Sequence, residues 1–239
     1  MFPHSDACER NKGPILEVLR QAFAGCKHVL EIGSGTGQHA VHFATELPWL
    51  VWQPSELADA MPALRKRIFN EGPSNLRAPV ALDVTEPPWD VRKVDGVFTA
   101  NTLHIMHWPQ VEAFFAGLPA VTKPGAVLAI YGPFRYGGEY TSASNESFDK
   151  LLYARDAGSG IRDFEKVDAL ARGAGFEFVA DHPMPANNQT LVFALRSPSR
   201  SGAEAMLRLC FSMQRSSSSH LTVARRARRT WPGHCLSPL

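Results

Sequence analysis

Four residues near the start of the chain have the types and spacing of a ligand-binding turn. Glu31, Gly33, Gly35 and Gly37 form the pattern E-x-G-x-G-x-G between the apolar run HVLEI and the segment QHAVHFATEL. Glycine permits positive φ angles and lets the backbone approach a ligand without a Cβ atom in the way. The pattern therefore predicts a small-molecule site at this turn, and a purely structural turn is the alternative.

The dinucleotide fingerprint G-x-G-x-x-G fits the same turn in only one register. A start at Gly33 requires glycine or alanine at position 38, where the chain has Gln38, whereas a start at Gly35 ends on Ala40. This fit disfavours an NAD-dependent oxidoreductase. The unshifted pattern resembles the first motif of class I S-adenosylmethionine-dependent methyltransferases. The resemblance implies that the cofactor S-adenosyl-L-methionine is bound by Glu31, Gly33, Ser34, Gly35 and Gly37.

The segment VWQPSEL offers two replacements for the acid that commonly ends the second strand of nucleotide-binding folds. Aligning Ser55 with the serine or threonine that often follows this acid places Gln53 in the acid's position. The Gln53 amide can accept a hydrogen bond from a ribose hydroxyl. Glu56 can supply the carboxylate instead, or it can favour the positive end of the following helix. Both residues are candidate cofactor ligands.

Further polar residues follow the next two predicted strands. The resemblance implies that Asp83, directly after PVAL, contacts the adenine amino group, and that the segment FTANTLHIMHW, with Asn101, lines the ligand cleft. A helix cap or a solvated turn is the alternative for Asp83. His104 and His107 are candidate general bases because imidazole can titrate near neutral pH. A hydrogen-bonded core histidine is the alternative for His104.

These candidates require strands and helices that alternate along the chain. Strands are predicted for HVLEI, LVWQ, PVAL, DGVFTA, AVLAIYG, FEFVAD and QTLVFAL. Helices are predicted from Pro14 onward, over QHAVHFATEL, over the face formed by Leu57, Met61, Leu64 and Ile68, and over the face formed by Val111, Phe114, Phe115 and Leu118. We expect an α/β, three-layer Rossmann-like class I methyltransferase fold with a mostly parallel seven-stranded sheet and an antiparallel final strand. Ligands of such sheets bind beyond the carboxyl ends of the strands.

A more specific resemblance rests on eight short motifs in order: ERNKGPIL, SGTGQHA, WQPSE, LDV, YGPF, SNESFD, GIRD and MPANN. From about Cys8 to Leu195 the chain resembles the methyltransferase-like protein 26 family and its bacterial relatives, the domain of unknown function 938. Glu56 departs from it, because aspartate is expected in WQPSD. The resemblance implies fold and cofactor but no substrate. Residues of its motifs that can rim an acceptor site are Tyr131, Arg135, Asn145, Arg162, Asp163, Asn187 and Asn188. A surface ion pair is the alternative for Arg162 and Asp163, and a tight turn for MPANN.

Composition separates the chain into two parts. Residues 197–239 contain seven arginines and one acid, a charge of +6, so the total of +2 leaves −4 for residues 1–196. We expect a methyltransferase-like domain over 1–196 and a basic Ser/Arg-rich tail over 197–239, disordered or weakly helical. The acidic domain disfavours nucleic-acid binding, although the tail can make weak contacts to RNA or anionic lipid.

The remaining observations concern the compartment and the cysteines. No apolar run approaches the roughly 20 residues of a membrane span, and the N-terminal segment lacks the apolar middle of a signal peptide. We therefore expect a cytoplasmic protein without membrane contact. Cys8, Cys26, Cys210 and Cys235 form no close pair and have no metal-ligand spacing, so no metal site is predicted.

The leading functional hypothesis is an S-adenosylmethionine-dependent methyltransferase. The chain lacks the N/D-P-P-Y/F sequence of many base and protein amide methylases and a strand-end cysteine for RNA cytosine methylation. These features favour a small-molecule acceptor, with protein methylation left open. The alternative is a non-catalytic cofactor-binding or interaction module of the same fold. The sequence gives no indication of the oligomeric state.

Overall fold

The main sheet of the protein has seven strands in the order β3-β2-β1-β4-β5-β10-β9. The computed structural model describes residues 4–196. The neighbours from β3 to β5 are parallel, whereas β10 is antiparallel to both β5 and β9. The predicted fold class is confirmed. The strands are β1 His28–Ile32, β2 Val51–Glu56, β3 Val80–Ala81, β4 Val94–Ala100, β5 Thr122–Gly132, β9 Phe176–Met184 and β10 Asn188–Leu195.

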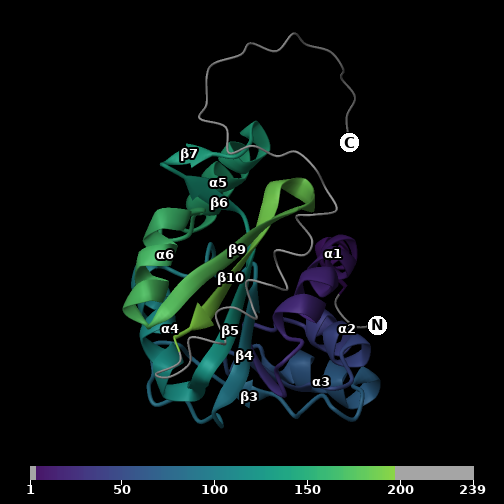
Figure 1. The fold of residues 1–239 in the computed structure, drawn as a ribbon. Coiled ribbons are helices and arrows are strands. Elements are labelled where there is room, and N and C mark those ends of the chain that lie inside the picture. The colour runs from purple at the N-terminus through teal and green to yellow at the C-terminus, as the bar shows by residue number, and fades with distance from the viewer. Residues whose placement is uncertain (1–3, 197–239) are drawn as a thin grey trace, which may run out of the picture. The chain divides into compact units, whose positions relative to one another are not determined.

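Helices cover both faces of this sheet, as Figure 1 shows. Helices α1 and α2 pack on one face together with α3, and α4 and α6 pack on the other. A 3₁₀ turn, Pro185–Asn187, joins β9 to β10. The helices are α1 Asp6–Ala22, α2 Gln38–Glu46, α3 Met61–Glu71, α4 Trp108–Val121 and α6 Phe164–Gly173.

Each face of the sheet has its own hydrophobic core. Phe114 of α4 belongs to one cluster and Phe43 of α2 to the other. Neighbouring strand residues point to opposite faces, and β4 follows this rule, with Val97 in the first cluster and Phe98 in the second. Burial on both faces explains why the central strands are almost continuously apolar in sequence.

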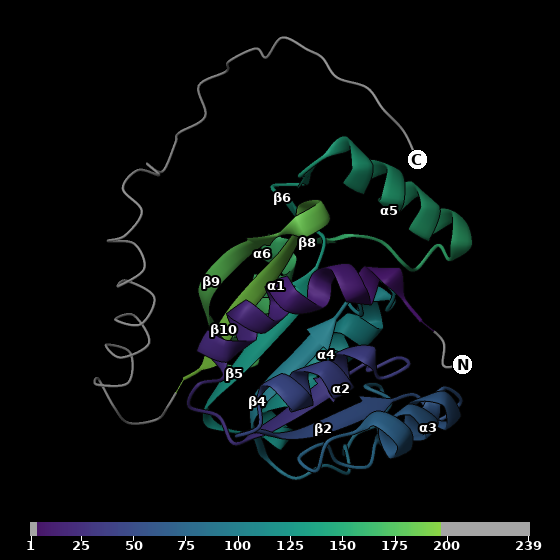
Figure 2. The ribbon, with the colours of Figure 1, turned by 90° about the vertical axis from the view of Figure 1, so that its right-hand side faces the viewer.

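An insertion follows β5 at its carboxyl end. It contains a three-stranded sheet, ordered β7-β6-β8, and the helix α5 Ala143–Arg155. The strands are β6 Phe134–Tyr136, β7 Glu139–Tyr140 and β8 Arg162–Asp163. Figure 2 shows α5 at the end of the main sheet where β5 leads into β6. The sequence patterns did not predict these elements, because strands of two or three residues leave no measurable periodicity and α5 buries only Asn145 and Leu152.

The structure differs from the predicted helix starts in two places. Pro14 lies inside α1, which begins at Asp6 because the Ser5 side chain caps it by accepting a hydrogen bond from the Cys8 amide at 3.4 Å. The prediction that the first helix starts at Pro14 is therefore wrong. Leu57 lies outside α3, which begins at Met61, because β2 continues to Glu56.

One prediction is not tested by this fold. Residues 197–239, the predicted basic tail, lie outside the described residues, so the tail and its boundary stay predictions. Within residues 4–196, no helix has both the length and the apolar character that crossing a bilayer requires.

Candidate cofactor site

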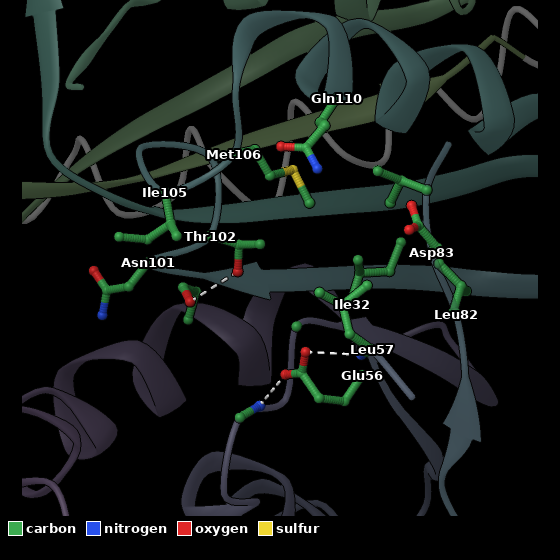
Figure 3. Close-up of a pocket in the computed structure, with 14 residues that line it drawn as sticks. Ile32, Glu56, Leu57, Leu82, Asp83, Asn101, Thr102, Ile105, Met106 and Gln110 are labelled. Carbon is green, nitrogen blue, oxygen red and sulfur yellow. Dashed lines mark hydrogen bonds between the residues drawn. The ribbon is translucent and has the colours of Figure 1, made fainter. Parts of the chain in front are cut away.

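A cavity of about 420 Å³ lies at the carboxyl ends of β1, β2, β3 and β4. These strands are parallel neighbours, so their ends meet at one edge of the sheet, where ligands of such sheets bind. Figure 3 shows side chains from all four strand ends and from the loop after β4 around the cavity. The lining residues are Ile32, Gly33, Gly35, Glu56, Leu57, Leu82, Asp83, Val84, Ala100, Asn101, Thr102, Ile105, Met106 and Gln110.

The glycine turn forms one wall of the cavity, and two of its positions favour glycine for different physical reasons. Gly33 has φ +75°, and a Cβ atom there would lie 2.7 Å from Thr102 Oγ1. Gly35 has φ +55°, and no atom lies within 4 Å of the position its Cβ would take. Close packing therefore requires Gly33, whereas Gly35 leaves open space toward the cavity that a ligand can fill.

Ser34 fastens this turn to β2 and does not line the cavity. The Gly33 and Ser34 amides both donate to the Ser55 carbonyl, at 3.1 and 2.9 Å, and the Ser55 amide donates to Ser34 Oγ at 3.2 Å. Gly37, φ +83°, lies against Leu64 of α3, where a Cβ atom would come within 2.8 Å of Cδ1. Both residues stabilise the turn through contacts with β2 and α3 and do not line the cavity.

Glu56 is the acid at the end of β2. Its carboxylate accepts hydrogen bonds from the Gly35 amide at 2.6 Å and the Leu57 amide at 2.9 Å, and it lines the cavity (Figure 3). Gln53 lies three residues earlier on β2 and is absent from the lining. The Gln53 amide group donates to the carbonyls of Ala78, at 2.8 Å, and Pro54, at 3.0 Å. Of the two candidates in VWQPSEL, the structure brings only Glu56 to the cavity.

Glu31 lies beneath the turn, with 2% of its surface exposed. Trp52 Nε1 donates to its carboxylate at 2.9 Å. The pKa of Glu31 is raised to about 7, mainly by burial and also by the nearby Glu56 carboxylate, while hydrogen bonds from Trp52 and Ser34 oppose this shift. Glu31 therefore changes charge near neutral pH, directly behind the glycine turn.

Asp83 and Asn101 lie on two sides of the cavity in Figure 3. Asp83 follows β3, and one of its carboxylate oxygens accepts from the Thr85 amide and hydroxyl at 2.8 and 2.7 Å. Asn101 follows β4 with φ +57°, an unusual angle for a residue other than glycine, and its amide donates to the Tyr131 carbonyl at 2.8 Å. The ends of β3 and β4 thus bring the side chains of Asp83 and Asn101 to the wall of one cavity.

The loop after β4 supplies lining that the sequence indicated only in part. The segment FTANTLHIMHW was expected to line a cleft, and Thr102, Ile105 and Met106 do so. Gln110 was missed because it lies in α4, beyond that segment. Its Oε1 atom accepts from the His107 amide at 2.8 Å. The sequence signal for Gln110 is the capping box, in which Gln110 follows the N-cap residue His107 by three positions.

His104 is 5% exposed and lies outside the residues that line the cavity. Its ring contacts Phe148 of α5 edge to face at 5.5 Å between centroids, and a Cβ atom on Gly132 would lie 3.6 Å from Nδ1. The pKa of His104 is lowered to about 4, mainly by burial and also by the positive charge of Arg162, against the opposing effect of Asp149. Within residues 4–196 neither ring nitrogen has a hydrogen-bond partner. A neutral imidazole with an available lone pair is the result.

His107 has a different environment from His104. It precedes α4, is half exposed, and its Nε2 atom lies 2.8 Å from the Asp156 carboxylate. Its ring covers Gly158, where a Cβ atom would come within 2.4 Å. The hydrogen bond from His107 is the main cause that lowers the pKa of Asp156. This pair joins the start of α4 to the end of α5, and neither residue lines the cavity.

The cavity therefore brings together five of the predicted cofactor residues, Gly33, Gly35, Glu56, Asp83 and Asn101. The lining suits a nucleoside-type cofactor. The Glu56 carboxylate can accept hydrogen bonds from hydroxyl groups, and the Asp83 carboxylate can accept them from an amino group. Apolar side chains such as Ile105 and Met106 can cover a flat ring, and the absent side chain of Gly35 leaves room for a ligand.

Several known structures with the same architecture are methyltransferases. The fold matches an O-methyltransferase family protein from Burkholderia thailandensis with a TM-score of 0.70 and 18% identity, over 81% of this chain and 59% of that one. It matches human N-acetylserotonin methyltransferase in complex with SAM with a TM-score of 0.64 and 13% identity, over 80% and 58%. PigF with SAH matches with a TM-score of 0.65 and 16% identity, over 77% and 61%.

At these identities the likeness shows the class I methyltransferase fold, and this chain spans less than two thirds of the length of each of the three proteins. The sequence itself matches one protein family. Residues 2–195 fit the family described as "Protein of unknown function (DUF938)", which agrees with the resemblance found in the eight motifs. The chain belongs to this family.

Proposed function

We propose that the protein is an S-adenosylmethionine-dependent methyltransferase that acts on a small-molecule acceptor. The observation that supports this proposal most strongly is the cavity at the ends of β1 to β4, where Gly35 leaves open space beside the carboxylate of Glu56. S-adenosylmethionine and S-adenosylhomocysteine are named in the structures of two proteins with this fold. The likeness of fold and the lining chemistry support the same cofactor here.

Each lining group has a specific part in this proposal. Glu56 accepts hydrogen bonds from the ribose hydroxyls, while the Gly35 and Leu57 amides hold its carboxylate in place. Asp83 accepts a hydrogen bond from the adenine amino group, and its second carboxylate oxygen remains available because Thr85 occupies the first. Asn101 contributes its side-chain amide, from the end of β4, as a hydrogen-bonding group for the cofactor. Glu31 carries a negative charge behind the turn above pH 7.

The reaction needs alignment more than covalent help from the protein. The bound cofactor supplies an electrophilic methyl group, and the protein aligns the acceptor and excludes water. His104 removes the proton of an acceptor hydroxyl or amine, because its ring is neutral and its nitrogens have no partner among the described residues. His107 is the second candidate for this task; its Nε2 atom pairs with Asp156 and its ring covers Gly158.

Calorimetry of the full chain with S-adenosylhomocysteine tests the cofactor assignment. We expect an affinity on the micromolar scale, roughly −8 kcal/mol. Folded protein that gives no heat with this compound or with the methyl donor contradicts the proposal. Incubation of the protein with isotope-labelled methyl donor and a metabolite extract then identifies the acceptor by mass spectrometry. Binding without any labelled product would favour the non-catalytic cofactor-binding module.

A further inference from the structure

Four successive backbone carbonyls of the loop after β4 accept hydrogen bonds from one short segment of the insertion. Residues 103–106 provide the carbonyls, and residues 159–162 provide the donors. Ser159 Oγ donates to Ile105 at 2.8 Å, and the Gly160 amide donates to His104 at 2.9 Å. Arg162 supplies the donors to the first and the last of the four carbonyls.

The Arg162 guanidinium is the centre of this contact. Its Nε atom donates to the Leu103 carbonyl at 3.0 Å, and its Nη2 atom donates to the Met106 carbonyl and, at 2.9 Å, to the Gly158 carbonyl. The guanidinium carbon also lies 6.0 Å from the centre of the Trp108 ring. A planar fork of several donors can bridge separate carbonyls in this way, whereas the single ammonium group of lysine cannot.

The donor segment is itself held by α5. The Asp149 carboxylate accepts from the Ile161 amide and, through its other oxygen, from the Tyr140 hydroxyl. Asn145, which is 5% exposed, donates to the Asn187 carbonyl in the turn between β9 and β10 at 2.9 Å. The insertion is thus also bonded to the main sheet at the turn between β9 and β10. The segment that carries Arg162 is therefore held in place by α5.

The loop that Arg162 holds is the one that brings side chains to the cavity. Ile105 and Met106 line the cavity, and their amides donate to the Thr102 carbonyl at 3.0 Å. His104 lies between these lining residues and Leu103. The carbonyls that the segment 159–162 contacts therefore belong to the residues whose placement sets the cavity wall and the orientation of the imidazole.

We propose that Arg162 is a positioning residue, which fixes the loop 101–108 by its backbone and thereby sets the cofactor cavity and the place of His104. Arg162 does not line the cavity, so it acts through the loop and not by contact with the cofactor. The inference rests on the proposed cofactor function for its effect on binding. Its effect on the loop is independent of that function.

The test compares Arg162→Gln, Arg162→Lys and Ser159→Ala with the control Arg172→Gln in the full chain. Arg172 also pairs with a neighbouring group, Asp168 at 2.8 Å, but it lies on α6. We expect Arg162→Gln to weaken S-adenosylhomocysteine binding about tenfold in calorimetry, because partly buried carbonyls lose their charged donor. Arg162→Lys should recover part of this loss, Ser159→Ala should show a smaller loss, and the control should bind like the wild type.

Two measurements on the ligand-free protein follow the loop and the imidazole, and the first of them separates positioning from a general loss of stability. In hydrogen exchange, the Ile105 and Met106 amides should exchange at least about tenfold faster in Arg162→Gln, while core amides of β4 keep their rates. In NMR titration, the pKa of His104 should rise in Arg162→Gln, since a positive charge is removed while Asp149 remains.

Each outcome distinguishes the inference from the proposed function. Wild-type protein that binds no S-adenosylhomocysteine refutes the proposed function, while exchange and titration still test the role of Arg162. Wild-type binding together with unchanged binding and unchanged loop exchange in Arg162→Gln overturns the inference. If Arg162→Gln fails to fold, Ser159→Ala and Arg162→Lys provide the test. Exchange rates at Ile105 and Met106 that equal those of the wild type in both variants overturn the inference.

Discussion

The Gly35 amide donates a hydrogen bond to the Glu56 carboxylate at 2.6 Å, which joins the glycine turn after β1 to the end of β2. The contact orients one carboxylate oxygen of Glu56 toward the turn, and Glu56 lines the cavity. A charge-assisted hydrogen bond of this length holds a side chain more firmly than one between neutral groups. The glycine turn and the end of β2 therefore form one preorganised part of the cavity wall.

The first prediction concerns the two candidates in VWQPSEL. Glu56→Gln should weaken S-adenosylhomocysteine binding at least about tenfold, because a neutral amide accepts hydrogen bonds less strongly than a carboxylate. Gln53→Ala should leave the affinity within about twofold, since its amide faces the Ala78 and Pro54 carbonyls. Calorimetry on both variants gives the comparison. A larger loss in Gln53→Ala than in Glu56→Gln would contradict the assignment.

The second prediction concerns Gly33. Alanine there must adopt φ +75° and place Cβ against Thr102, so Gly33→Ala should lower the free energy of unfolding by about 2–4 kcal/mol. Gly125→Ala is the matched control, because φ is +78° and no atom lies within 4 Å of its Cβ position. It should cost only the backbone strain of about 1–2 kcal/mol. Urea unfolding checks both, and equal losses would show that contact with Thr102 has no cost.

The third prediction is a pH dependence that comes from Glu31. Its pKa is about 7 in the folded protein and 4.5 ordinarily, so between these values the folded state binds more protons than the unfolded state. Its contribution to stability is therefore complete below pH 4.5 and is lost as the pH rises through about 7. The shift corresponds to about 3 kcal/mol.

Urea unfolding between pH 4.5 and 7.5 tests this dependence in wild type, Glu31→Gln and the control Glu139→Gln, an exposed acid of β7. Glu31→Gln should lose stability less steeply with rising pH than the wild type, because the titrating group is gone. The control should follow the wild type. Parallel curves for wild type and Glu31→Gln would refute the raised pKa.

The fourth prediction separates the two histidines. His104→Gln should reduce methyl transfer by roughly 10²- to 10⁴-fold, the usual contribution of a general base, and leave S-adenosylhomocysteine affinity nearly unchanged. The pKa of His104 is about 4, so its protonation should not reduce wild-type turnover between pH 8 and 6. His107→Gln should keep turnover, since that ring covers Gly158 and is paired with Asp156. Full activity in His104→Gln would exclude it as the base.

The main sheet was predictable because its strands carry strong local signals. HVLEI and AVLAIYG are apolar throughout, as burial on both faces requires, and each was placed within a few residues of its strand. The start of α1 was missed, because Pro14 is a stronger sequence signal than the Ser5 cap that sets the start. Pro14 is tolerated inside the helix.

The candidate site was predictable where a residue directly follows a strand. Asp83 and Asn101 come to the cavity for this reason, whereas the role of Gln53 depended on where β2 ends. Strand ends are set by pairing with neighbours, and the register of β2 on β1, with Ser55 opposite Ile32, is not written in local sequence. The contact between Arg162 and Leu103 joins residues 59 apart in sequence, and no pattern along the chain could indicate it.

The contact between the insertion and the loop after β4 is made to backbone carbonyls, and this has a consequence for how the family can diverge. Any residue presents the same carbonyl, so side chains at positions 103 to 106 can change without loss of the hydrogen bonds. The donors come partly from side chains, so Ser159 and Arg162 cannot change as freely. Substitutions at positions 103 to 106 can therefore alter the cavity wall while the hydrogen bonds that support it stay the same.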